Sequence, residues 1–177
     1  MKRIFLFGLT IVLYASSCSS HEDKSDNQDK TANTNQPADN AGTSIPGIEK
    51  IEFTDSLQLQ ANENMRFNKE LFRVHAGKKI RLIFKNTQAK TPGSMSHNVV
   101  VLKTGVDIAD FAEVAVKAKE EQYVPASLDS LIIAHTRLVA AGDSEELEFA
   151  IPAPGVYDFI CSFPGHWGTM QGKIAAE

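Results

Sequence analysis

The stretch that decides the fold reads Cys-Ser-Phe-Pro-Gly-His-Trp-Gly-Thr-Met, at residues 161–170 near the C-terminus. It places a thiol, an imidazole and a thioether within one short segment. The chain enters it along an alternating apolar run, so Cys161 is expected near the end of a strand. Pro164 and Gly165 predict a turn, and a strand-to-strand loop of this length can bring the cysteine, histidine and methionine towards one point.

These side chains together are typical of a copper site. The thiolate of Cys161 and the thioether of Met170 suit Cu(I), whereas both Cu(II) and Cu(I) accept the imidazole of His166. Two histidines and one cysteine in a plane, with a weakly bound axial methionine, form the blue-copper arrangement. The pattern therefore predicts a copper site that needs a second histidine from elsewhere in the chain.

His97 is the best candidate for the second histidine. It lies just before the continuous apolar run 99–102, which places it at the start of a central strand. His75 lies at a predicted turn and His135 lies in the middle of a β-rich run, so we expect both at the surface. His21 lies in a polar segment and is expected to be solvated.

Other chemistries fit the same residues less well. A zinc site is disfavoured because methionine is a poor zinc ligand and no second cysteine is available. A cysteine hydrolase needs a Cys–His pair oriented by a third group, and a small sandwich offers no evident cleft for a substrate. The remaining alternative is a protein that stores or delivers copper with the same ligands.

Composition excludes several classes of protein. The chain has 177 residues, of which 42% are hydrophobic and 23% charged, and this suits one globular domain with appendages. The net charge of −4 gives no basic field for nucleic acid. The two cysteines are too few for a disulfide-rich scaffold or a four-cysteine metal site.

Outward from the motif, the pattern predicts an all-β domain. Apolar residues alternate with polar ones in short runs that are separated by turn residues, as in half-buried strands. These runs lie at residues 51–53, 57–61, 65–67, 72–74, 80–84, 99–102, 131–139, 147–151, 157–161 and 173–175. Roughly eight short strands predict a Greek-key β-sandwich or barrel.

One segment has helical spacing instead. Its apolar residues are Ile108, Phe111, Ala112, Ala115 and Ala118. The preceding aspartate, at position 107, can cap this helix, and the aspartate at position 110 is favourable in its first turn. The sequence therefore predicts one short helical insertion in the β domain.

The N-terminus resembles an export signal. Residues 1–17 combine a basic start, an apolar stretch and small residues, as in a cleaved signal peptide. Cys18 follows directly, as the lipidated cysteine does in bacterial lipoproteins. Residues 18–47 are mostly polar and predict a disordered tether. Residues 48–177 are the predicted folded domain.

Together with Met-Ser-His-Asn at residues 95–98, the motif resembles the azurins, a group of the cupredoxin family. The segments 57–68 and 123–138 also resemble azurins, and the likeness covers about residues 57–175. The spacing Cys-x4-His-x3-Met separates azurin-like loops from the shorter Cys–His spacing of plastocyanins. The resemblance implies a cupredoxin-like Greek-key fold.

The resemblance also implies the residues of one type 1 copper site. Its four ligands would be His97, Cys161, His166 and Met170. The backbone N–H groups of Asn98 and Phe163 would donate to the Cys161 sulfur, and the Asn98 side chain would tie the two ligand loops together.

This chain departs from azurins at several positions. Ser96 stands where azurins carry a glycine, and Asn86 replaces a buried histidine, so a pH-linked switch there is lost. Val99 stands where azurins often have tryptophan, and the single tryptophan is Trp167. The azurin disulfide cannot form, because the cysteines at positions 18 and 161 are the only two.

Family resemblance implies an electron-transfer protein and not an enzyme. Its partners would be redox proteins, such as a c-type cytochrome or a terminal reductase or oxidase. It would be exported, periplasmic or outward-facing, and held to the bacterial cell envelope by a lipid on Cys18. A small apolar surface around His166, which we call the docking patch, would meet these partners; it consists of Met95, Pro164, Gly165 and Trp167.

Overall fold

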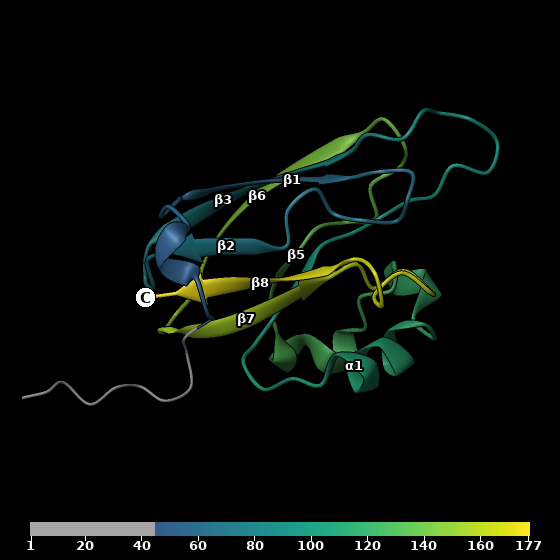
Figure 1. Ribbon diagram of the computed structural model, residues 1–177. Helices are drawn as coiled ribbons and strands as arrows, with labels where there is room; N and C mark the ends of the chain where they lie inside the picture. The colour runs from purple at the N-terminus through teal and green to yellow at the C-terminus, as the bar shows by residue number, and fades with distance from the viewer. Residues whose placement is uncertain (1–44) are drawn as a thin grey trace, which may run out of the picture. The chain divides into compact units, whose positions relative to one another are not determined.

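The computed structural model describes residues 45–177, which form two β-sheets and one α-helix (Figure 1). The predicted signal peptide, Cys18 and most of the predicted tether lie outside the described residues. Within the described part, no helix is long and apolar enough to cross a membrane. The elements in chain order are η1 (Ile48–Lys50), β1 (Ser56–Ala61), β2 (Leu71–Val74), β3 (Lys79–Asn86), β4 (Val100–Leu102), α1 (Ile108–Ala115), η2 (Lys119–Glu121), η3 (Ala126–Leu131), β5 (Ile132–His135), β6 (Ser144–Ala150), β7 (Gly155–Ile160) and β8 (Gln171–Ala176).

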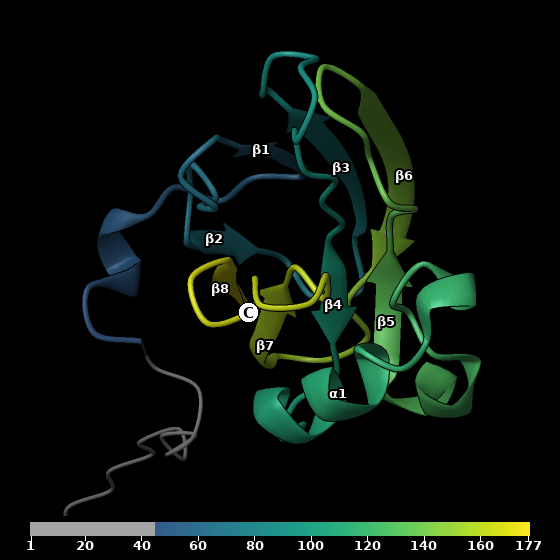
Figure 2. The ribbon, with the colours of Figure 1, turned by 90° about the vertical axis from the view of Figure 1, so that its right-hand side faces the viewer.

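The eight strands confirm the predicted all-β fold. One sheet has the order β1-β3-β6, and the other has the order β2-β8-β7-β4-β5. Strands β1 and β3 are parallel, as are β2 and β8, whereas the other pairs are antiparallel. The first three strands, β1, β2 and β3, thus alternate between the two sheets (Figure 2).

The main core lies between the two sheets. Strands β1 and β3 each bury every second side chain, in agreement with the alternation in the sequence. Aromatic rings fill the centre, where Phe67 packs against Phe84 and Phe159 at centroid distances of 6.0 and 5.6 Å. Cys161 and Met170 belong to the same core. The loop 161–170 is therefore anchored in the main core at both of its ends.

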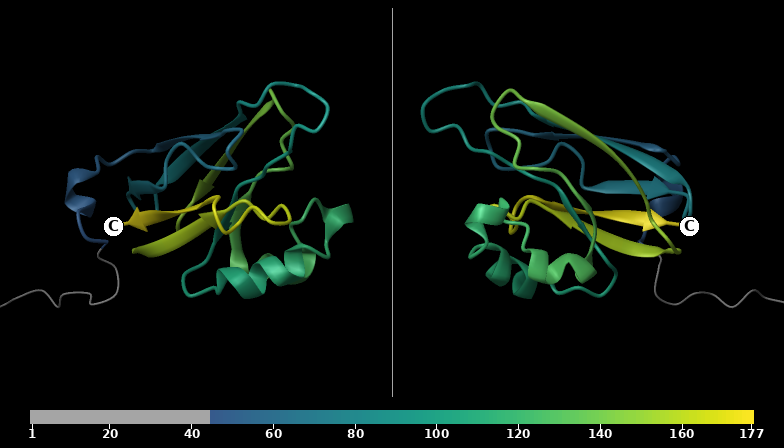
Figure 3. Two further views of the ribbon diagram at one scale, coloured as in Figure 1. Left: turned by 45° about the vertical axis from the view of Figure 1, so that its right-hand side comes forward. Right: turned by 180° about the vertical axis from the view of Figure 1, so that it is seen from behind.

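A second core lies on the outer face of the five-stranded sheet. Val100 and Leu102 of β4 pack there with Phe111 and Ala115 of α1, whereas Val101 faces the main core. Because both faces of β4 are covered, its sequence is continuously apolar rather than alternating. Figure 3 shows α1 lying along this sheet.

The helix itself begins as the sequence predicts. A carboxylate oxygen of Asp107 accepts hydrogen bonds from the backbone N–H groups of Ala109 and Asp110, at 2.8 and 3.0 Å. These bonds satisfy two donors that have no partner within the helix.

Three predicted strand runs differ from the structure. Residues 51–53 follow η1 and form one isolated bridge, Phe53 to Arg73. Residues 65–67 form no strand: a turn that ends at Met65, where φ is 52°, bonds back to Asn62, and Phe67 then forms one isolated bridge with Ala61. The strand predicted at 131–139 is only β5, because residue 131 ends η3 and the backbone beyond residue 135 leaves the regular ladder.

The sandwich has two distinct ends. The C-terminus and η1 lie at one end, and the loop from β7 to β8 lies at the other (Figures 1 and 3). The connection from β3 to β4 also reaches that second end. It contains His97, and the loop from β7 to β8 contains residues 161–170.

Candidate metal centre

The loop 161–170 is held by its own backbone. The N–H of Cys161 donates to the carbonyl of Met170 at 2.9 Å, which closes the loop at its base. The N–H groups of Thr169 and Met170 both donate to the carbonyl of His166, at 3.0 and 2.8 Å. Gly165 adopts a φ of 82°, which glycine tolerates better than other residues. The loop therefore holds His166 over Cys161.

His97 is fixed by a two-way backbone bridge. Its N–H donates to the carbonyl of Val139 at 3.0 Å, and the N–H of Val139 donates to the carbonyl of His97 at 2.7 Å. Its side chain has no solvent-exposed surface. This bridge lies at the predicted start of the β4 segment and directs the ring towards the loop from β7 to β8.

Three donor atoms meet at this end of the sandwich. Nδ1 of His97 lies 3.1 Å from Nδ1 of His166, and the Cys161 sulfur lies 3.9 and 3.6 Å from these two nitrogens. A transition-metal ion bound at about 2.0 Å by imidazole and about 2.3 Å by thiolate keeps its donors about 3 to 4 Å apart. The donor set therefore fits one small, thiophilic metal ion.

Burial determines the protonation of these groups. It raises the pKa of the Cys161 thiol to about 11, although hydrogen bonds from the backbone N–H groups of Asn98 and Phe163 partly offset this effect. Burial, with a smaller contribution from His166, lowers the pKa of His97 to about 4. Burial also lowers the pKa of His166. At neutral pH both imidazoles are therefore uncharged and ready to bind a metal.

Asn98 connects the two segments that carry the donors. Its Oδ1 accepts a hydrogen bond from the N–H of Ser162 at 2.9 Å, and its Nδ2 donates to the Ser162 hydroxyl at 2.9 Å. The Ser162 hydroxyl also donates to the carbonyl of Tyr123 at 2.6 Å. Asn98 and Ser162 are both buried, so these bonds are shielded from water.

Sequence reasoning missed the segment that receives these bonds. Gln122 and Tyr123 both adopt left-handed backbone, with φ of 56° and 63°, and their carbonyls accept from Asn98 and Ser162. Neither residue type favours this conformation, so the sequence carried no signal for it. The Tyr123 ring packs on Phe163, whose ring lies 4.6 Å from that of His166.

The two methionines differ in their surroundings. Met170 is completely buried in the main core, directly beside the Cys161 backbone. Met95 is half-buried, two residues before His97. Both are thioether side chains near the donor cluster.

The other histidines lie away from the cluster. His75 is exposed and stacks on Phe53 at a centroid distance of 4.0 Å. His135 is exposed on β5. Among the described residues, the one group of three metal-binding side chains is His97, Cys161 and His166.

Asn86 and the docking patch also have defined places. Asn86 is buried, and its amide donates to the carbonyls of Met95 and Val139 at 2.8 and 3.1 Å. Within the docking patch, Gly165 is exposed, whereas Met95, Pro164 and Trp167 are half-buried. Trp167 packs against the second core.

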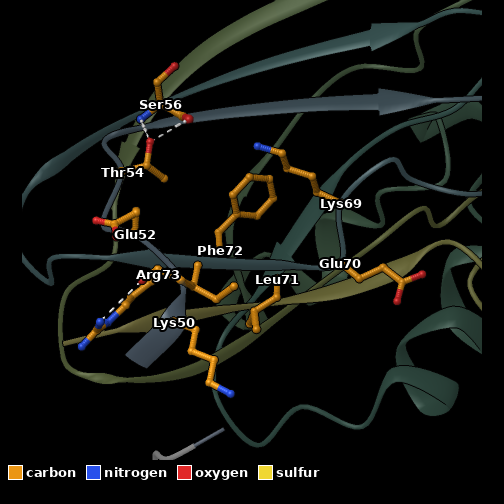
Figure 4. Close-up of a pocket in the computed structure, with 10 residues that line it drawn as sticks. Lys50, Glu52, Thr54, Ser56, Lys69, Glu70, Leu71, Phe72 and Arg73 are labelled. Atoms are coloured by element: carbon orange, nitrogen blue, oxygen red, sulfur yellow. Dashed lines mark hydrogen bonds between the residues drawn. The ribbon is translucent and has the colours of Figure 1, made fainter. Parts of the chain in front are cut away.

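A pocket of about 440 Å³ lies elsewhere, beside η1 and β2 (Figure 4). Its lining mixes charges of both signs, including Lys50, Glu52 and Lys69. Arg73, which also lines it, is already paired with Glu177 at 2.8 Å. The pocket shares no residue with the donor cluster.

Comparison with known proteins identifies the family. The family of plastocyanin/azurin copper-binding proteins matches residues 54–177. The chain belongs to this family. The donor cluster is accordingly a copper site with His97, Cys161 and His166 as residues of one type 1 centre.

Individual relatives in the plastocyanin/azurin family agree with this result. The chain is 34% identical to outer membrane protein H.8 of Neisseria gonorrhoeae over 66% of its length, and the match spans 64% of the H.8 protein. It is 31% identical to the azurin of Alcaligenes faecalis, over 67% of this chain and 94% of that one. The structure of auracyanin A from Chloroflexus aurantiacus, a "blue" copper protein, matches with a TM-score of 0.62 and 32% identity, over 71% of this chain and all of that one.

Proposed function

We propose that this protein transfers electrons one at a time in the bacterial cell envelope. The observation that carries the proposal is the buried donor set, whose three atoms lie 3.1 to 3.9 Å apart and are fixed by backbone bonds. A bound copper ion would supply the Cu(II)/Cu(I) couple. The residues would hold one geometry for both oxidation states, so little rearrangement would accompany each transfer.

We further propose that Met170 supplies the weak axial thioether. Its burial in the core and its backbone bond to Cys161 support this role. Met95 offers a matched comparison, because it is a half-buried methionine next to the same site. Met170→Leu should change the copper spectrum and raise the reduction potential, whereas Met95→Leu should change neither. The reverse result would assign the axial position to Met95.

Copper storage or delivery is the competing function. A delivery site must open, whereas the donors here are at most 3% exposed and Asn98 ties the two donor-bearing segments together. The test is repeated electrochemical cycling in the presence of a Cu(I) chelator, with the bound copper measured after each cycle. Electron transfer predicts that copper is retained, and Asn98→Ala should accelerate its loss. Rapid transfer of copper from the unaltered protein to the chelator would favour delivery.

We propose that the protein is anchored to the envelope through a lipid on Cys18. The name of the Neisseria relative, an outer membrane protein, supports an envelope location. Cys18→Ser should shift the protein from the membrane fraction to the soluble fraction of cells. Cys161→Ser is the matched control and should leave the partitioning unchanged. Membrane retention of the Cys18 variant would contradict the anchor.

The proposed partners are redox proteins, either a c-type cytochrome or a terminal reductase or oxidase. They would meet the docking patch, which lies in and beside the segments that carry the donors. The patch has no charged side chain, so it can lose water easily during a brief encounter. The acidic net charge of −4 favours protein partners over nucleic acid.

A further inference from the structure

The Gln88 side chain lies against the far edge of the His97 ring. Its amide nitrogen is 2.9 Å from Nε2 of His97, the ring nitrogen that does not face Cys161. The same nitrogen donates to the carbonyl of Asn62 at 3.2 Å. The amide oxygen accepts a hydrogen bond from the N–H of Met95 at 3.0 Å. One side chain thus connects the ring to two separate segments of backbone.

These bonds fix which way the amide points. With its oxygen held by the N–H of Met95, Gln88 presents its NH2 group to Nε2 of His97. A neutral imidazole that accepts a hydrogen bond at Nε2 carries its own hydrogen on Nδ1. That is the nitrogen that lies 3.9 Å from the Cys161 sulfur.

Metal binding needs the opposite arrangement. An imidazole that binds copper through Nδ1 carries its hydrogen on Nε2 and donates it to a neighbouring group. Two N–H groups would then face each other between Gln88 and His97. The conflict is removed if the amide turns so that its oxygen accepts the hydrogen of Nε2. This turn gives up two bonds, the one from the N–H of Met95 and the one to the carbonyl of Asn62.

We propose that Gln88 is a positioning residue for His97, and that its amide turns its oxygen to Nε2 when His97 binds copper. The inference rests on the proposed copper function, because it concerns a ligand of that site. Partners of this kind orient a ligand ring and raise its basicity. A more basic imidazole stabilises Cu(II) relative to Cu(I) and therefore lowers the reduction potential. Gln88 would thus adjust both the copper affinity and the potential.

Two substitutions should shift the potential in opposite directions. Gln88→Glu offers one oxygen to the N–H of Met95 and the other to the hydrogen of Nε2, so it needs no turn, although it loses the bond to the carbonyl of Asn62. It should bind Cu(II) more tightly and have a lower potential. Gln88→Leu removes the acceptor, so it should raise the potential and weaken Cu(II) binding about 10- to 100-fold. Gln88→Met serves if the leucine variant does not fold.

A charge control tests for a long-range effect of added charge, and the signals of the His97 ring report on the hydrogen bond itself. Gln58 is exposed on β1 and is not among the donor residues or their hydrogen-bond partners, so Gln58→Glu should leave the potential nearly unchanged. The ¹⁵N and ¹H signals of His97 in the Cu(I)-loaded protein give a direct readout. They should show a hydrogen on Nε2 that is bonded in the unaltered protein and in Gln88→Glu, but not in Gln88→Leu.

Opposite shifts in potential, with the expected Nε2 signals, would support the proposal. Shifts of the same sign, or no shift in either variant, would overturn it and leave Gln88 with a purely structural role in its loop. An unaltered protein that forms no blue copper site would refute the proposed function itself. The unaltered protein is measured before any Gln88 variant, so a failure of the proposed copper function can be distinguished from a failure of the Gln88 proposal.

Discussion

The Cys161 thiol is closed off from solvent, and this decides how the site takes up metal. Burial raises its pKa to about 11, so it carries a proton at neutral pH. The metal ligand is the thiolate, which means that copper must displace this proton. The two imidazoles require no such exchange, because burial lowers the pKa of both His97 and His166.

Copper affinity should therefore depend on pH in a simple way. Between about pH 7 and 9, loading releases one proton, from Cys161, so affinity should rise about tenfold for each unit increase in pH. Towards pH 4 the dependence should steepen, because the imidazoles also become protonated when free of metal. Competition with a chelator of known proton affinity measures this slope. An affinity independent of pH would mean that the thiol is already ionised or is not a ligand.

At the scale of elements, α1 covers the outer face of β4, and this is why the sequence of β4 is continuously apolar. Phe111 of α1 is 2% exposed and packs on the outer face of the sheet, against residues of β4. Cys161 lies on the other face, in the main core. Stability from α1 and the chemistry of the copper site are therefore carried by opposite faces of one sheet.

Removal of the Phe111 ring should lower the stability of the fold without changing the copper site. Phe111→Ala should lower the free energy of unfolding by about 3 to 5 kcal/mol, because it removes a large buried side chain. The spectrum of the copper-loaded protein should change little. Val114→Ala, at an exposed position of the same helix, is the matched control and should cost far less. Denaturant titration gives the energies, and a lost copper spectrum in the folded Phe111 variant would contradict the separation.

The sequence predicted elements where local pattern and burial agree. Three features were predicted in this way: the alternating burial of β1 and β3, the continuously buried β4, and the helix cap at Asp107. The left-handed backbone of Met65 was not, because methionine rarely adopts positive φ. The convergence of His97, Cys161 and His166 was predicted by their residue types and by the family resemblance. The role of Gln88 was not, because its contacts depend on how the loop folds back over His97.

At the scale of the whole molecule, the proposed function requires one end of the sandwich to meet a partner. Trp167 has two possible roles, because it belongs to the proposed docking patch and also packs against the second core. Two substitutions are therefore needed to distinguish an effect on apolar packing from an effect on docking. Phenylalanine retains an apolar ring at this position, whereas lysine places a charge on the patch.

Electron self-exchange, in which two patches meet face to face, separates the two roles. Trp167→Lys should slow it about tenfold, which corresponds to about 1.4 kcal/mol, because a charge must lose water at the contact. Trp167→Phe should have a much smaller effect. Gln58→Lys adds the same charge on β1 and should leave the rate nearly unchanged. If the Trp167→Lys rate equals that of the unaltered protein, electrons do not pass through this surface.

The visible absorption spectrum of the oxidised, copper-loaded protein tests the central claim most directly. A bond between the Cys161 thiolate and copper predicts an intense blue charge-transfer band. Cys161→Ser should lose the band, whereas Cys18→Ser, which removes the other cysteine, should keep it at full intensity. A copper-loaded protein without the band, or a Cys161→Ser variant that remains blue, would contradict the assignment of this site.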